Sequence, residues 1–458
     1  MSGIASFSGL ASGLDTNSLV QSLVSVERQP IARLQVKQRN LNSMSRRVTD
    51  ISTELKKVQS DWEKMDTKKE MRDYTSSSSD QARMTTSISG EPIPGNHTIE
   101  IGNLAQAQVN VSAGVSSAST AGLAGSGNLT ITVGSDAPVT VAVGAGDGLA
   151  DVADNINNST ADVQAAVIFD GTDYRLQIMA NDPGLSNAVT IAEDPGITLS
   201  LDDPGSMIIP PLDASFSVNG LPMTRSSNTV ENAIPGLKLE LKAPTAAATP
   251  ITVNIERDTG PLKKKLEDFV GHYNFTVNLI NKEFTYNGEA RVGDSLSGDA
   301  VLRSLKNRMS ATVVMPMSGA PFTAPFTTLK SVGIEIQNDG TLSLNTTTFD
   351  NVMSSNEDEV VSLFVGDPDA SINGLAATFD SMIDDYVDAA DGILTKKVSG
   401  YSTQVDEIDD QIDDMERRID KYELRLRMQF AAMEQSISQM QNQGSQMMGM
   451  LQSLQKKS

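Results

Sequence analysis

Residues 34–65, LQVKQRNLNSMSRRVTDISTELKKVQSDWEKM, carry the pattern that determines the architecture of this chain. A large apolar side chain recurs at every seventh position, at Leu34, Leu41, Val48, Leu55 and Trp62. The positions three residues further on hold Met44, Ile51, Val58 and Met65, with Lys37 as a polar exception. This spacing places one apolar stripe along a helix, and a stripe of this kind is buried only against another helix.

A second stripe with the same period lies near the C-terminus, at Val405, Ile412, Ile419, Leu426, Met433, Met440, Met447 and Leu454. Nothing comparable lies between the two stripes, so the simplest partner for one end of the chain is the other end. We therefore predict an α+β multidomain protein whose N- and C-terminal helices pair in a coiled-coil or helical-bundle leg, with inserted β-rich head domains. The predicted seam of the leg consists of Leu34, Leu41, Val48, Ile51, Leu55, Val58, Trp62, Val405, Ile412, Ile419 and Leu426.

The middle of the chain changes period from seven to two, which is typical of strands. Alternating segments occur at residues 98–101, 129–133 and 139–143. The serine run at residues 76–79 predicts a hinge between leg and head. Asn338-Asp-Gly340 predicts a hairpin, because Asp-Gly is a strong signal for a tight turn.

These changes of pattern predict a division into domains. We expect a terminal segment (1–40 with 430–458) that becomes ordered on assembly, and a helical leg (41–74 with 259–429). We also expect a first β-rich head domain (75–107 with 211–258) and an outer β-rich head domain (108–210) inserted into it.

Composition excludes several classes of function. The chain has 458 residues, no cysteine and a net charge of −22, so disulfides and thiolate chemistry are impossible. Residues 73–258 contain 21 Asp and Glu against six Lys and Arg, which argues against binding to nucleic acid. No apolar run is long enough to span a membrane, and the first 27 residues lack the basic start of a secretory signal peptide.

The sequence shows no recognisable catalytic arrangement. His97 and His272 are the only histidines, and neither stands in a pattern that indicates a triad. The acidic runs lack the ligand spacing of a calcium loop. We therefore predict no catalytic residue, no metal site and no cofactor.

Four blocks of sequence resemble one protein family. They are GLASGLDT at residues 9–16 with LVQSL at 19–23 and ERQPI at 27–31, FSVNG at 216–220 with TRSSNTV at 224–230 and IPGL at 234–237, VGIEI at 332–336 with DGTL at 339–342, and RLRMQF at 425–430 with MEQSI at 433–437. In this order they resemble the flagellar filament cap family (flagellar hook-associated protein 2, FliD).

The resemblance implies a ring-shaped homo-oligomer at the distal tip of the bacterial flagellum, outside the cell, exported by the flagellar type III system. Such a cap retains exported flagellin and promotes its folding and insertion. The implied partners are further copies of the chain, flagellin, the hook–filament junction protein and a cytoplasmic export chaperone that binds the C-terminal region; neither nucleic acid nor membrane is among them. We predict that contacts with other subunits or with the filament involve Leu14, Leu19, Leu23, Phe430, Met433, Ile437, Met440, Met447 and Met450.

Two alternatives stay open from sequence. Flagellin and the hook–filament junction proteins also pair terminal helices around inserted β domains, although residues 9–16 and 224–230 favour the cap. An adhesin at the flagellar tip is the second alternative. It is weakened by the aromatic content of 4%, which offers few surfaces on which sugars could stack.

Overall fold

The computed structural model describes residues 13, 15–246, 249–284 and 295–455, with side chains described up to Leu451. The described chain forms two compact units. The helical unit contains the residues up to Met71 and those from Gly260 onward, and the β unit contains Arg72–Thr259. The two ends of the chain thus share one unit, and the mixed α+β, multidomain architecture predicted from the sequence is confirmed.

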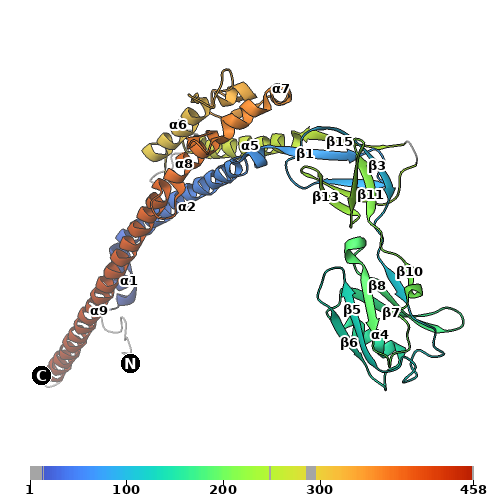
Figure 1. Cartoon of the computed structure of the whole chain (residues 1–458). Coiled ribbons are helices and arrows are strands. Elements are labelled where there is room, and N and C mark those ends of the chain that lie inside the picture. Colours follow the sequence, from blue (N-terminus) through green and yellow to red (C-terminus); the bar gives the residue numbers. More distant parts are fainter. Residues whose placement is uncertain (1–12, 14, 247–248, 285–294, 456–458) are drawn as a thin grey trace. The chain divides into compact units, whose positions relative to one another are not determined.

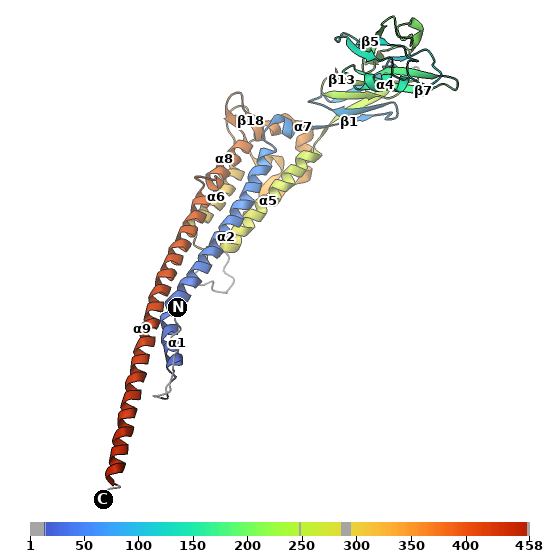
Figure 2. The ribbon, with the colours of Figure 1, turned by 90° about the horizontal axis from the view of Figure 1, so that it is seen from below.

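Two long helices form the backbone of the helical unit. Helix α2 (Gln29–Glu63) and helix α9 (Ile393–Gln455) lie side by side in both views (Figures 1 and 2). They run antiparallel, because Ile31 packs near Ile419 while Gln38, further along α2, donates a hydrogen bond to Asp409, further back on α9. The short helix α1 (Thr16–Glu27) precedes α2 and packs on α9.

The remaining elements of the helical unit pack around the C-terminal half of α2. They are α3 (Lys68–Met71), α5 (Gly260–Phe284), α6 (Ala300–Val314), the 3₁₀ turn η3 (Leu329–Val332), β16 (Ile334–Ile336), β17 (Leu342–Leu344), α7 (Thr346–Val365), β18 (Gly366–Asp367), β19 (Ile372–Asn373) and α8 (Leu375–Val387). Their apolar faces enclose one core with the C-terminal half of α2. The hairpin predicted at Asn338-Asp-Gly340 is confirmed, because β16 and β17 pair antiparallel on either side of it.

Trp62 lies at the centre of this core and is fully buried. Its ring centroid is 4.4 Å from that of Phe379 in a stacked arrangement and 4.7 Å from that of Phe269 in an edge-to-face arrangement. Phe364 is a third neighbour at 5.5 Å. One tryptophan thus joins α2 to α5, α7 and α8, and offset or edge-to-face aromatic pairs stabilise such a junction beyond the burial of area.

Tyr273 on α5 gives the helical unit a testable response to alkali. Burial raises the pKa of its hydroxyl to about 12, because the phenolate is poorly solvated in the core, whereas an unfolded tyrosine titrates near 10. Between these values the unfolded state binds fewer protons, so stability falls as pH rises. We expect Tyr273→Phe to remove up to about 2 kcal/mol of that fall, measured by urea unfolding at about pH 9 and about pH 11.5. An equal fall in both chains would contradict the assignment.

The β unit has two cores. The first is formed by an open five-stranded sheet that faces a three-stranded sheet. The strand orders are β1-β15-β3-β11-β12 and β13-β14-β2, with antiparallel pairing throughout. The strands are β1 (Asp73–Ser78), β2 (Met84–Ile88), β3 (Gly95–Asn103), β11 (Ala214–Val218), β12 (Leu221–Arg225), β13 (Thr229–Ile234), β14 (Leu237–Leu241) and β15 (Ile251–Asp258). Alternate residues of β2, β3, β11, β13, β14 and β15 point inward and form the core.

The second core of the β unit is built by the chain between β3 and β11. Two antiparallel sheets, β10-β4-β8-β7 and β6-β5-β9, are packed with helix α4 (Leu149–Asn157). The remaining elements are β4 (Val109–Val111), β5 (Gly127–Val133), β6 (Val139–Val143), β7 (Val163–Phe169), β8 (Tyr174–Ala180), η1 (Leu185–Asn187), β9 (Val189–Glu193), η2 (Pro204–Ser206) and β10 (Met207–Ile209). The exact domain limits predicted at residues 107 and 210 stay a prediction.

The hinge predicted at residues 76–79 is wrong. Residues 76–78 belong to β1, where Ser76 pairs with Ile255 and Ser78 with Val253. A strand at the edge of a sheet can be polar, because its pairing uses backbone groups rather than apolar side chains. The connection between the units instead follows Met71 and precedes Gly260.

Candidate assembly surface

The far end of the helical unit is a two-helix structure made by α1 and α9. The Asp15 carboxylate accepts a hydrogen bond from the Ser18 backbone N–H at 3.0 Å and caps α1. Val20 and Val24 of α1 are buried with Ile31 and Ile419. Half-buried apolar side chains complete this small cluster: Ile412, Met415, Leu426 and Phe430.

Arg427 of α9 contacts the first turn of α1 and so marks where α1 begins alongside α9. Its guanidinium donates to the Asn17 side-chain oxygen at 3.2 Å and pairs with Glu423 at 2.6 Å. Beyond this level α9 continues for more than seven helical turns to Gln455. In both ribbon views this part of α9 extends past α1 (Figures 1 and 2).

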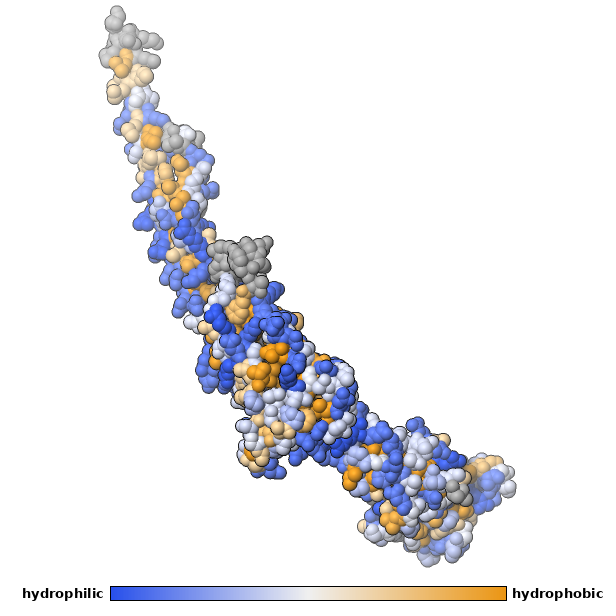
Figure 3. Space-filling model, turned by 90° about the horizontal axis from the view of Figure 1, so that it is seen from above, coloured by the Kyte–Doolittle hydropathy of each residue, from blue (hydrophilic) through white to orange (hydrophobic). Residues whose placement is uncertain are grey.

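The distal part of α9 is apolar on one side and carries no charge. Residues 435–455 contain no Asp, Glu, Lys or Arg. Met433 and Ile437 are half-buried, whereas Met440, Met447 and Met450 are 64%, 66% and 69% exposed. Apolar residues lie among polar ones along this helical end, at the upper left of Figure 3. An exposed run of unbranched, polarizable side chains is suited to packing against more than one partner surface.

The other predicted contact residues differ in exposure: Phe430 is half-buried in the α1–α9 cluster. Leu19 and Leu23 on α1 are 43% and 42% exposed. Leu14 lies outside the described residues. The structure adds exposed apolar side chains that the sequence analysis did not select: Val26, Val36, Leu424 and Met428. These four residues do not belong to the seven-residue repeat. Periodicity therefore does not identify them, and only their exposure in α1, α2 and α9 does.

Ile412, Ile419 and Leu426 of α9 pack with α1 and the start of α2, whereas the C-terminal half of α2 lies in the core with α5, α7 and α8. One continuous seam between α2 and α9 stays a prediction for the eleven predicted seam residues. Those that are buried are Leu41, Val48, Ile51, Leu55, Val58, Trp62 and Ile419, and those that are half-buried are Leu34, Val405, Ile412 and Leu426. Ile408 is also buried and was missed. It lies three residues after Val405, at the alternate position of the same heptad, which was the available signal.

The part of the chain that the structure describes places no catalytic arrangement of side chains at this surface. His272 Nδ1 lies 2.6 Å from Asp61 Oδ2, and His97 Nδ1 lies 3.2 Å from the Asn219 side-chain nitrogen. In the described residues no group of three or more His, Asp or Glu could hold a metal ion. No helix in the described part of the chain is both long and apolar enough to cross a lipid bilayer.

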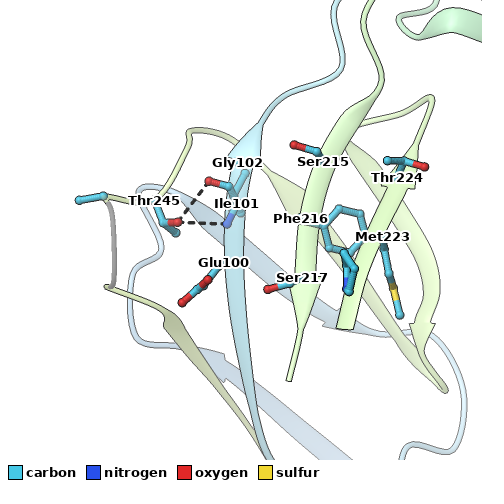
Figure 4. A pocket seen from close by; sticks show the side chains of 11 residues that line it. Glu100, Ile101, Gly102, Ser215, Phe216, Ser217, Met223, Thr224 and Thr245 are labelled. Atoms are coloured by element: carbon cyan, nitrogen blue, oxygen red, sulfur yellow. Dashed lines mark hydrogen bonds between the residues drawn. The ribbon is translucent and has the colours of Figure 1, made fainter. Parts of the chain in front are cut away.

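An open groove of about 590 Å³ is lined by residues of β3, β11 and β12 in the five-stranded sheet (Figure 4). Glu100 is the one titratable residue that lines it. The Thr245 hydroxyl is already engaged, since it accepts from Ile101 N–H at 3.1 Å and donates to Ile101 C=O at 3.2 Å. Phe216, the one aromatic residue among those that line the groove, is buried and offers no exposed platform for a ligand.

The paired helices α1 and α9, with exposed apolar side chains near the end of α9, are the features of a protein that assembles with partners. Sequence comparison specifies which kind. The family described as flagellar hook-associated protein 2 C-terminus matches residues 212–442, its N-terminal counterpart matches residues 12–108, and a flagellin hook IN motif matches residues 128–182. The chain belongs to the flagellar hook-associated protein 2 (FliD) family, a family of structural flagellar proteins rather than enzymes.

Curated relatives and solved structures agree. An A-type flagellar hook-associated protein 2 of Pseudomonas aeruginosa is 29% identical, over 89% of each chain. A flagellar hook-associated protein 2 of Escherichia coli O157:H7 is 25% identical, over 88% of this chain and 90% of the relative. The crystal structure of the D1-D2-D3 domains of the flagellar cap protein FliD from Escherichia coli has a TM-score of 0.66 at 24% identity, covering 78% of this chain and 99% of that one, which is a likeness of fold.

Proposed function

We propose that this chain is the cap at the distal tip of the bacterial flagellar filament, where it retains exported flagellin and promotes its folding and insertion. One observation carries the proposal: the α9 side chains from Met440 to Leu451 are all exposed, although apolar methionines recur among them. A helix end of this composition is stabilised when it is covered by another protein. Insertion of the α1–α9 end among filament subunits would supply that cover.

The partners follow from this placement. Further copies of the chain form a ring, flagellin emerges beneath it, and the hook–filament junction protein supports the cap before the first flagellin is added. An export chaperone that covers the C-terminal region of α9 in the cytoplasm would keep its methionines from aggregating before passage through the type III channel. None of these roles breaks or forms a covalent bond, so none requires a catalytic residue.

The cap is favoured over the other axial flagellar proteins by the extent of the match. Both the N-terminal and the C-terminal family regions are present in order, whereas the flagellin hook motif covers only residues 128–182.

Deletion of this chain from its bacterium tests the function. We expect short or absent filaments together with unpolymerised flagellin in the medium, and recovery of long filaments when the chain is supplied again. Filaments of normal length without the chain would overturn the proposal. Normal filaments combined with lost attachment to surfaces would instead indicate an adhesin.

A further inference from the structure

Helix α9 carries a regular row of carboxylates beside its seam. Asp406, Asp409, Asp413, Glu416 and Asp420 are all exposed and follow one another at intervals of three and four residues. Each directly follows an apolar residue that faces the neighbouring helix: Val405, Ile408, Ile412, Met415 and Ile419. At 3.6 residues per turn, the five carboxylates therefore form one acidic flank, rotated roughly 100° from the seam.

The opposite side of the same helix carries Glu407 and Asp414 and becomes basic from Arg418 onward. Arg418, Lys421 and Arg425 are exposed at the same spacing of three and four. They lie roughly 100° from the seam in the other direction. We name these three residues, together with Arg33 of α2, the basic flank.

One hydrogen bond assigns Arg33 to that side. The Gln38 side chain of α2 donates to Asp409 at 2.6 Å, so this side of α2 adjoins the acidic flank. Arg33 directly precedes the seam residue Leu34, as Arg418 precedes Ile419, and is exposed. In an antiparallel pair, residues that hold this position on the two helices lie on the same side, opposite Gln38.

The acidic flank is not neutralised within the described chain. Glu423 and Asp414 pair with Arg427 and Arg417 on their own helix. Within residues 15–246, 249–284 and 295–451, in contrast, no basic group lies within 4.0 Å of Asp406, Asp413, Glu416 or Asp420. A row of unpaired like charges is unfavourable for an isolated helix at low salt, and an opposite row on another molecule relieves it.

We propose that the acidic flank of one copy docks against the basic flank of the next copy, so that charge complementarity between neighbouring stalks holds the ring together. This inference rests on the proposed function and names where its self-association occurs. Because the two flanks are different surfaces on opposite sides of one element, the contact is heterologous. A repeated heterologous contact closes into a ring when the rotation between copies permits it.

Two charge-reversal variants of the full chain test the contact. The first carries Asp406→Lys, Asp413→Lys and Asp420→Lys, so that both flanks are basic. The second carries Arg418→Glu, Lys421→Glu and Arg425→Glu, so that both flanks are acidic. We expect each variant alone to self-associate at least tenfold more weakly than the parent chain in sedimentation velocity. An equimolar mixture should associate again, because every basic flank then meets an acidic one.

The mixture separates this contact from pairing inside one chain, since an internal pair broken by reversal is not restored by adding the other variant. The matched control for the first variant is Glu91→Lys, Asp182→Lys and Asp202→Lys in the β unit, which gives the same change in net charge at exposed sites and should associate like the parent. Far-UV circular dichroism confirms that each variant folds. Salt near 1 M, where the Debye length is about 3 Å, should weaken the parent's association and leave little difference between variants.

Three results would overturn the inference: a parent chain that stays monomeric, variants that associate like the parent, or a mixture no better than either variant. Variants that assemble normally but bind less flagellin would assign the flanks to a filament contact instead. These results leave the proposed function standing if the parent chain still restores filaments to the deletion strain. Failure of that restoration, with intact self-association, counts against the function and not against the flanks.

Discussion

Replacing Trp62 by alanine is expected to destabilise the helical unit by about 3–5 kcal/mol, the range observed when a buried aromatic side chain is truncated. Trp62 is fully buried and contacts rings from three further helices, Phe269, Phe364 and Phe379. Its removal leaves a cavity where α2 joins α5, α7 and α8, and each lost aromatic pair adds about 0.5–1.5 kcal/mol. Urea unfolding followed by circular dichroism at the helix band measures the loss, because helices are concentrated in this unit.

Phe275→Ala is the matched control. Phe275 is on α5 in the same unit but is 53% exposed, so its truncation should change stability by less than about 0.5 kcal/mol. If the Trp62 and Phe275 variants unfold at the same urea concentration, the aromatic junction does not hold the unit together. The β unit provides an internal reference, since its own transition should not move in either variant.

Truncation after Phe430 is expected to abolish filament elongation while leaving the rest of the fold intact. In the described structure the α9 side chains between Met440 and Leu451 are exposed and Met433 and Ile437 are half-buried. Their removal takes away few internal contacts, so the midpoint of thermal unfolding should shift by no more than a few degrees. Filament length in the deletion strain, measured by electron microscopy, should stay as short as without any cap.

A full-length variant separates the shape of α9 from its apolar surface. Met440→Gln, Met447→Gln and Met450→Gln keep a good helix former at each position but remove the apolar side chains. Filaments as short as those of the truncated chain would attribute the loss to the methionines. Filaments of normal length with either variant would show that the distal part of α9 is dispensable and would remove the proposed insertion into the filament.

The sequence predicts the helical unit well because its signal is long and strictly periodic. The repeat from Leu34 to Trp62 places its members on one face of α2, and the face is buried from Leu41 onward. Asn338-Asp-Gly340 similarly specifies its hairpin, since few residues other than glycine adopt the positive φ of 90° at Gly340. In both places local pattern and tertiary packing favour the same structure.

Other features could not be predicted because they depend on partners distant in sequence. Ser76 becomes a strand residue only because β15, almost 180 positions later, offers it a backbone ladder. Trp62 was assigned to the seam, but its aromatic neighbours come from α5, α7 and α8, and no periodicity in residues 34–65 identifies them. Leu34 continues the repeat and is nevertheless half-buried, because only α9 covers this part of α2 whereas several helices cover its other end.

The candidate surface shows the same limit. Periodicity selected Met440 and Met447 as members of a seam, and it does not distinguish an apolar side chain covered by its own chain from one that is uncovered. The exposed fractions make that distinction. The two charged flanks were visible in the sequence as runs, but their placement on opposite sides of the paired helices required the Gln38–Asp409 contact.

The position of the chain on growing flagella tests the central claim most directly. Gold-labelled antibodies against the β unit, Arg72–Thr259, can be applied to intact cells while their filaments lengthen. A cap anchored by its α1–α9 end predicts label at the distal tip of every filament, at all lengths, and nowhere else. Label at the base or scattered along the filament would contradict a tip-bound cap, whatever the helical unit contributes to stability.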